Sequence, residues 1–215
     1  MGSSPLYLLR DPELFVAFLI SIIVGLTFHE FSHAAVATLQ GDQTARLQGR
    51  LTLNPIAHLD PLGSIALVVA GFGWGRPVPV NPTRLRNRRL GAVLVGLAGP
   101  AANFVIALVA VVALRLAYPA LGTTFNVDFS VTLLYTLVAV NVVLGVFNLL
   151  PIPPLDGSTL LSIALPPSRQ NIVAFLDQYG IFLLLGLLIL APNLLTPIFR
   201  AITEALYGLV GLPAG

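Results

Sequence analysis

The stretch His29-Glu30-Phe31-Ser32-His33 places two imidazoles one helical turn apart, with a carboxylate beside the first. Residues i and i+4 share one helix face, so His29 and His33 can present two nitrogen atoms to one metal ion. In such an H-E-x-x-H pattern the metal is Zn²⁺, and the glutamate is the general base toward zinc-bound water. The pattern predicts a zinc-dependent hydrolase with His29 and His33 as ligands and Glu30 as catalytic base. The alternative is a set of polar residues that hydrogen-bond inside a helical bundle.

Catalytic zinc keeps three protein ligands and one open position, so a third ligand is needed. The chain has no cysteine, which leaves histidine, aspartate and glutamate. Most remaining acids lie at expected segment ends, whereas Asp156 lies within an apolar stretch. Asp156 is therefore the predicted third ligand, and the alternative is that it caps the helix that follows it. His58, the only other histidine, is the competing ligand and could line the mouth of the active site.

The apolar run at residues 15–28 leads directly into His29. The whole chain of 215 residues is 56% hydrophobic and 9% charged, whereas soluble domains have about 25% charged residues. These values predict an integral membrane protein, in which buried ionisable residues point to a functional site. The arginines cluster between hydrophobic segments, so the lipid bilayer is the expected partner and nucleic acid is not. A signal peptide is a poor reading of the first run, because its flank lacks a cationic region.

Hydrophobic runs predict three long helices, at about residues 13–39, 90–118 and 130–150. Alternation over residues 45–53 predicts a small membrane-associated β region. The apolar segment at 61–74 has fourteen residues, fewer than the roughly twenty that a span needs, and is predicted to be re-entrant. After three prolines at 151–154, the chain continues with a short apolar segment at 158–165 and a longer block at 172–210.

The arginines also predict topology, because arginine-rich loops stay cytoplasmic. Residues 76–89 hold five arginines and no acid, whereas residues 119–129 hold one aspartate and no cation. The first long helix then ends at the cytoplasmic face of the cell membrane, and both ends of the segment 42–74 lie on that side. This agrees with a re-entrant segment. It also brings His29, His33 and Asp156 to a similar depth, toward the cytoplasmic side.

Taken in order, these residues resemble the site-2 protease family of intramembrane zinc metalloproteases. His29-Glu30-x-x-His33 resembles the family's first motif, and Asn148-x-x-Pro151-x-x-Pro154-Leu155-Asp156-Gly157 resembles its second. Between them, Ala98-Gly99-Pro100-Ala101-Ala102-Asn103 resembles a recurrent helix-start or helix-packing signature. Residues 49–55 resemble a sequence found in a subgroup of the family that has a longer insertion between the first two core helices. The resemblance covers about residues 20–165.

The resemblance implies one Zn²⁺ per chain, held by His29, His33 and Asp156 within a three-helix catalytic core. It implies that Asn148 holds the substrate backbone or the oxyanion. A helix hides its carbonyls in hydrogen bonds, so a membrane substrate must be extended locally before attack. The β region is expected to bind that extended segment by β-augmentation. The expected form is minimal, without a PDZ-like insertion or a CBS-type domain.

The predicted fold is an all-α polytopic membrane protein with one membrane-embedded peptidase domain over residues 1–215. Its core is expected at about 13–165 and its C-terminal helices at about 172–210. The expected function is an intramembrane zinc metalloprotease that hydrolyses peptide bonds within or near transmembrane segments of membrane protein substrates. The expected partners are that substrate and an unidentified regulatory membrane protein. The alternative is a zinc-binding membrane transporter or channel that uses the same ligands.

Overall fold

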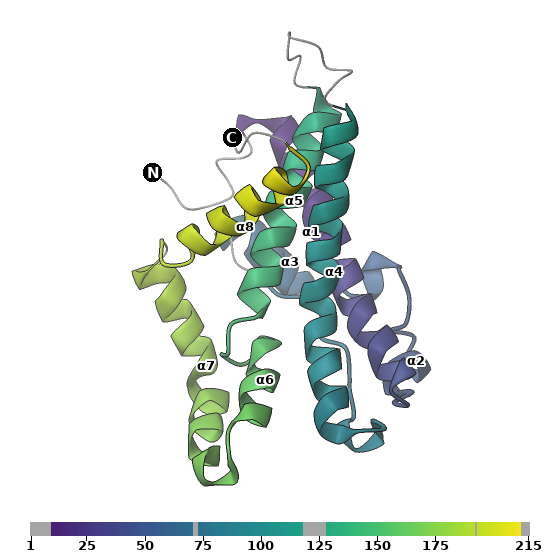
Figure 1. Ribbon diagram of the computed structural model, residues 1–215, viewed down its shortest axis with the longest axis vertical. Helices are drawn as coiled ribbons and strands as arrows, with labels where there is room; N and C mark the ends of the chain where they lie inside the picture. Colours follow the sequence, from purple (N-terminus) through teal and green to yellow (C-terminus); the bar gives the residue numbers. More distant parts are fainter. Residues whose placement is uncertain (1–9, 71–72, 118–127, 192, 212–215) are drawn as a thin grey trace.

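The computed structural model describes residues 10–70, 73–117, 128–191 and 193–211. Its centre is a bundle of three long helices, α1 (Pro12–Leu39), α4 (Arg88–Ala117) and α5 (Phe129–Asn148), which lie side by side (Figure 1). These three helices, and residues 170–187 of α7 (Gln170–Leu190), are long and apolar enough to cross a membrane. The prediction of an all-α polytopic membrane protein is confirmed.

Aspartate caps begin two of the long helices. Asp11 precedes α1 and accepts a hydrogen bond from the Leu14 amide at 3.1 Å. Asp128 precedes α5 and accepts one from the Val131 amide, also at 3.1 Å. Each carboxylate satisfies an amide that has no partner within its own helix. These three long helices begin and end within two residues of their predicted limits.

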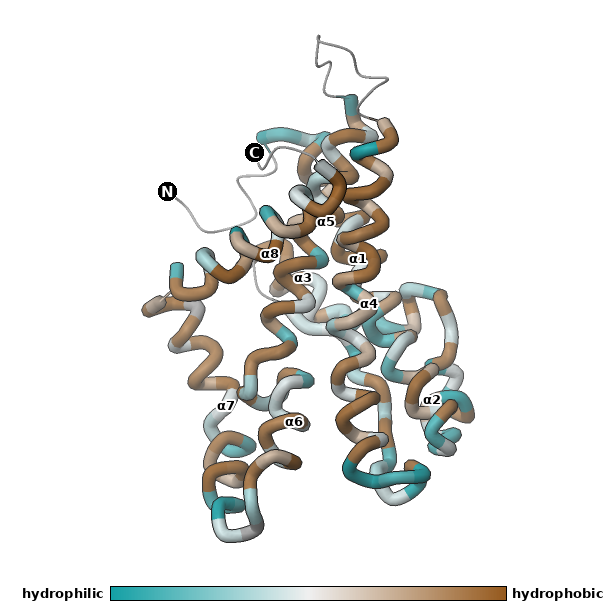
Figure 2. The backbone as a smooth tube through the Cα atoms, in the orientation of Figure 1, coloured by the Kyte–Doolittle hydropathy of each residue, from teal (hydrophilic) through white to brown (hydrophobic). Residues whose placement is uncertain are grey.

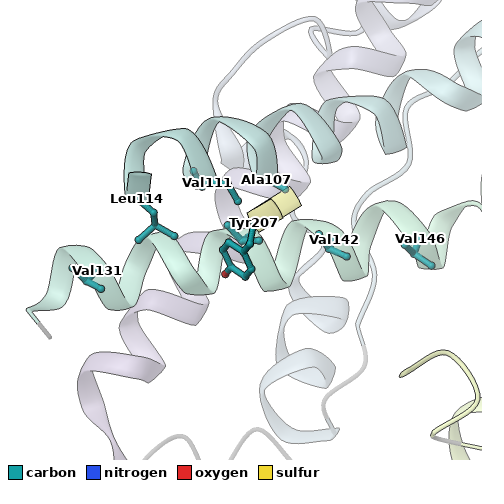
Figure 3. Packing of buried hydrophobic residues seen from close by; sticks show 9 residues of the cluster. Ala107, Val111, Leu114, Val131, Val142, Val146 and Tyr207 are labelled. Carbon is teal, nitrogen blue, oxygen red and sulfur yellow. The ribbon is translucent and has the colours of Figure 1, made fainter. Parts of the chain in front are cut away.

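The long helices carry their apolar residues along most of their length, as Figure 2 shows, with hydrophilic residues at the turn before α4. A buried cluster joins α4, α5 and the C-terminal helix α8 (Thr196–Leu209). Figure 3 shows this cluster, whose labelled members are Ala107, Val111, Leu114, Val131, Val142, Val146 and Tyr207. The last apolar block thus forms two helices, of which α8 packs across α5 (Figure 1).

The predicted β region at residues 45–53 was wrong. Residues Thr44–Leu47 form a short helix, α2, and the described residues hold no strand beyond one isolated bridge. The side chain of Asp42 accepts hydrogen bonds from the amide and hydroxyl of Thr44, which starts a helical turn. Gly49 then has a positive φ of 70°, which interrupts any extended run. The expectation that this region binds substrate as a strand loses its basis.

The predicted re-entrant segment is a short helix, α3 (Pro61–Ala70), between two chain ends that meet. Leu59 and Gly75 form an antiparallel bridge, and the Arg76 amide donates to the His58 carbonyl at 2.7 Å. Residues 71–72 of the prediction lie outside the described residues. These paired residues, 58–59 and 75–76, form a neck at the base of the segment. The chain leaves the neck at residue 59 and returns to it at residue 75, the path that a re-entrant segment requires.

Short elements connect these helices. After α3 the chain runs through residues 73–81 to η3 (Pro82–Arg84) and into α4. After α5 it passes through the proline-rich loop 149–156 into α6 (Gly157–Ala164), then through η5 (Pro167–Arg169) into α7. The segment before α4 and the proline-rich loop before α6 thus bring two distant parts of the sequence to the part of α1 that carries His29 and His33.

Candidate metal centre

Three side chains from two distant parts of the sequence converge beside α4. His29 and His33 lie on one face of α1, and Asp156 lies at the start of α6. The two imidazole Nε2 atoms are 3.0 Å apart. Asp156 Oδ2 lies 3.0 Å from His29 Nε2 and 3.3 Å from His33 Nε2. The structure thus brings together all three residues predicted as metal ligands.

The other ring nitrogens of the two histidines face oxygen atoms of α4. His29 Nδ1 lies 2.7 Å from Asn103 Oδ1, and His33 Nδ1 lies 2.7 Å from the Val95 carbonyl oxygen. These oxygens accept hydrogen bonds, so a neutral ring carries its proton on Nδ1 and leaves a lone pair on Nε2. Both lone pairs then point at the space shared with Asp156. This orientation by outer partners is typical of zinc-binding histidines.

The donor set fits a zinc ion. Asp156 Oδ2 is buried and receives no hydrogen bond from the described residues, and Asp156 makes no capping bond to α6 although it occupies the cap position. With the histidines protonated on Nδ1, no proton lies between the three atoms, and a cation would offset their mutual repulsion. Tetrahedral zinc with bonds of about 2.0–2.1 Å sets its ligand atoms about 3.3 Å apart. The observed separations of 3.0–3.3 Å are close to that value.

Glycines on α4 make room for this group. A Cβ atom added at Gly99 would lie 2.5 Å from His29 Nε2 and closer still to His33 Nε2. A Cβ atom added at Gly96 would lie 3.4 Å from the Asp156 carbonyl oxygen. The backbone of α4 therefore forms one wall of the metal group, and Gly99 permits the closest approach.

Glu30 lies beside the ligands and is buried, with 8% of its surface exposed. One carboxylate oxygen, Oε2, accepts a hydrogen bond from the Val78 amide at 3.2 Å. Val78 belongs to the segment 73–81 that returns from the re-entrant neck. The returning chain thus fixes Glu30 through its backbone, a contact for which the side chain of Val78 gives no signal in the sequence.

A cavity of about 530 Å³ adjoins the metal group. Residues of α1, α4, α5, α7, the segment 73–82 and the proline-rich loop line it, including Glu30, Val78, Asn148 and Leu184. Asn148 uses its side-chain amide to donate to the Leu144 carbonyl at 2.9 Å. The predicted catalytic residues Glu30 and Asn148 therefore face the same space, which has the size of a small-ligand pocket.

The structure does not bring His58 to this cavity. Its side chain is fully buried in the neck, where Nε2 lies 2.8 Å from the Thr52 carbonyl oxygen. The His58 carbonyl accepts from the Arg76 amide, so this residue holds the two chain ends together. The metal group found among the described residues contains His29, His33 and Asp156 without His58.

The family model described as Peptidase family M50 matches residues 17–188. The chain belongs to peptidase family M50. This is the site-2 protease family, so the resemblance drawn from the motifs is confirmed. The matched span of this M50 chain includes most of α1 and all of α4, α5 and α6, which position all three residues of the metal group.

Three curated relatives illustrate the similarity. The M50 chain is 43% identical over 187 residues to "Putative zinc metalloprotease YwhC" of Bacillus subtilis (strain 168), with 85% of each chain covered. It is 33% identical over 186 residues to "Putative zinc metalloprotease Rip2" of Mycobacterium tuberculosis (strain H37Rv), covering 84% of this chain and 69% of that one. It is 27% identical over 143 residues to "Zinc metalloprotease MJ0392" of Methanocaldococcus jannaschii, covering 66% and 32%. No solved structure matches the chain significantly.

Proposed function

We propose that this M50 peptidase is an intramembrane zinc metalloprotease, which hydrolyses peptide bonds within or near transmembrane segments of membrane protein substrates. The observation that carries the proposal is the metal group itself. Two histidine nitrogens on α1, a helix long and apolar enough to span a membrane, converge within 3.3 Å with one oxygen of Asp156 at the start of α6, beside the buried Glu30. The names of the curated relatives agree with zinc-dependent proteolysis.

Each residue of the site has a role in this proposal. His29, His33 and Asp156 would hold one Zn²⁺, which supplies a Lewis acid and lowers the pKa of bound water when present. Glu30 takes a proton from the attacking water and passes it to the leaving amine. The Val78 amide keeps one carboxylate oxygen of Glu30 in place. Asn148 lines the cavity and binds the substrate backbone or the developing oxyanion.

The proposed location is the cell membrane, with the active site toward the cytoplasm. The exposed arginines at residues 84, 86, 88 and 89 lie in η3, in the turn after it and at the start of α4, at the end of α4 nearer the metal group. Arginine-rich turns favour the cytoplasmic side. We further propose one peptidase domain over residues 1–215, a transmembrane protein as substrate and a regulatory membrane protein as a further partner.

Two variants test the function against the alternative of a zinc transporter. Glu30→Gln is expected to keep zinc and to lose cleavage of a model transmembrane peptide in detergent, by at least about 100-fold, because the general base is gone. Asp156→Ala is expected to lose both zinc and cleavage. Zinc is quantified on the purified proteins in parallel.

Full cleavage by Glu30→Gln would contradict the protease proposal. Zinc flux in liposomes that survives Glu30→Gln, without cleavage by the wild type, would favour the transporter. Stoichiometric zinc and full activity in Asp156→Ala would remove Asp156 from the ligand set.

A further inference from the structure

Behind His29, two buried asparagines connect the three long helices. Asn103 on α4 and Asn141 on α5 are both fully buried. Asn103 Oδ1 lies 2.7 Å from His29 Nδ1 on α1, and Asn103 Nδ2 donates to Asn141 Oδ1 at 2.9 Å. Buried amides of this kind make their hydrogen bonds within the protein, because water does not reach them.

The hydrogen bonds fix which way each side-chain amide points. Asn141 Nδ2 donates to the Leu137 carbonyl at 2.9 Å, so Asn141 must turn its oxygen toward Asn103. Asn103 Nδ2 donates to that oxygen and to the Gly25 carbonyl at 3.1 Å. Both hydrogens of the Asn103 amide are then used. Its oxygen is left facing His29, and it can only accept.

Hydrogen bonding prevents either amide from turning over. A Cβ atom added at Gly25 would lie 2.8 Å from Asn141 Oδ1, so α1 approaches α5 closely at this point. A reversed Asn103 would set its oxygen against two other oxygens and an N–H group against the proton on His29. His33 needs no such device, because its Nδ1 partner is a backbone carbonyl that cannot reverse.

We infer that Asn103 and Asn141 are positioning residues that hold His29 with its proton on Nδ1 and its Nε2 lone pair toward the metal. Asn103 acts directly on the ring, and Asn141 acts only by fixing the orientation of Asn103. The inference rests on the proposed zinc site. It assigns to α4 and α5 a part in choosing the tautomer of His29 on α1.

Zinc affinity of the purified full chain, measured against a competing chelator, tests this order of action. Asn103→Leu is expected to weaken zinc binding by about 10–100-fold, as losses of such outer partners typically do. Asn141→Leu is expected to weaken it less. The double variant is expected to match Asn103→Leu alone, since Asn141 has no role once Asn103 is gone. Effects that multiply, or no effect of Asn141→Leu, would overturn the inference.

Ser21→Ala is the matched control, because Ser21 is fully buried on α1 and its hydroxyl donates to the Ala17 carbonyl of the same helix, away from the metal group. This variant is expected to leave zinc affinity unchanged, whereas an equal loss would indicate that any buried polar deletion disturbs the site.

A second measurement reads the tautomer itself. In protein labelled with ¹⁵N-histidine and freed of metal, His29 is expected to show protonated Nδ1 in the wild type. Asn141→Leu, which leaves the His29 contact in place, is expected to give a mixture of tautomers, and an unchanged spectrum would contradict the inference. The tautomer measurement on the wild type and Asn141→Leu still tests the inference if Asn103→Leu does not fold. Neither readout depends on cleavage, so the inference and the proposed protease function can fail separately.

Discussion

Gly99 shows how much the metal group depends on one missing side chain. Because a Cβ atom there would overlap the Nε2 atoms of His29 and His33, Gly99→Ala should displace both rings. We expect zinc affinity to fall by about tenfold or more, as it does when ligand orientation is lost. Zinc per chain after dialysis against a weak chelator measures the effect.

Gly208→Ala is the control for this change, since nothing lies within 4 Å of a Cβ atom at Gly208 on α8. It should keep the wild-type zinc content. Equal zinc in Gly99→Ala and in the wild type would show that the rings can shift without losing the metal.

Asp42 gives the protein a stability that depends on pH. Burial alone would raise the pKa of this carboxyl group, but hydrogen bonds from Thr44 and Asn81 outweigh it and hold the pKa below 3.8. The unfolded chain binds the proton more readily. This stabilisation is therefore complete above about pH 4 and is lost as pH falls through the lower pKa of the folded state.

The free energy of unfolding of Asp42→Asn should consequently be about 1–3 kcal/mol lower than that of the wild type at pH 6, because the variant loses hydrogen bonds to a charged acceptor. The difference should shrink below pH 4. Thermal unfolding in detergent across this range checks the prediction, and a difference that stays constant with pH would contradict it.

The sequence predicted the metal residues unevenly, for physical reasons. The spacing of His29 and His33 is local to one helix, so it could be read directly. Asp156 followed from the scarcity of other acids in apolar surroundings. Asn103 was seen only as part of a packing motif, because its contact with His29 depends on how α4 packs against α1. An asparagine within an apolar helix was the signal that could have found it.

At the scale of elements, α7 contacts the site through few residues. Leu184 is buried at the cavity, and a Cβ atom at Gly180 would overlap the carbonyl oxygen of Pro153 in the loop before Asp156. Gly180→Ala should push α7 away from that loop. We expect a loss of peptide cleavage of about tenfold, since small displacements near a reacting centre are costly.

Gly186 on the same helix has open space around it, so Gly186→Ala is the matched control and should cleave normally. Peptide cleavage by the two variants is compared at equal zinc content. Equal rates for both would show that the contact between α7 and the proline-rich loop is not needed.

The elements themselves were predicted well where the pattern was long. Helix ends agreed closely because prolines, glycines and aspartate caps mark them in the sequence. The β region failed because a short alternating run at residues 45–53 competes with local hydrogen bonds to the Asp42 side chain and with the positive φ of Gly49. Neither effect is contained in the alternation.

At the scale of the whole molecule, topology can be tested cleanly because the chain has no cysteine. Arg86→Cys places a thiol at the turn before α4, and Ser130→Cys places one at the start of α5. Both positions are exposed. In intact cells, a membrane-impermeant maleimide should label the second variant and leave the first unlabelled. The opposite pattern would invert the proposed orientation.

The two halves of the metal group are far apart in the order of synthesis. His29 and His33 are made early, whereas Asp156 follows only after α4 and α5, the helices that carry Asn103 and Asn141. A partly synthesised chain in the membrane therefore has an incomplete ligand set and an unsupported His29. The metal group of this M50 peptidase is therefore complete only after the third long helix and the proline-rich loop have been made.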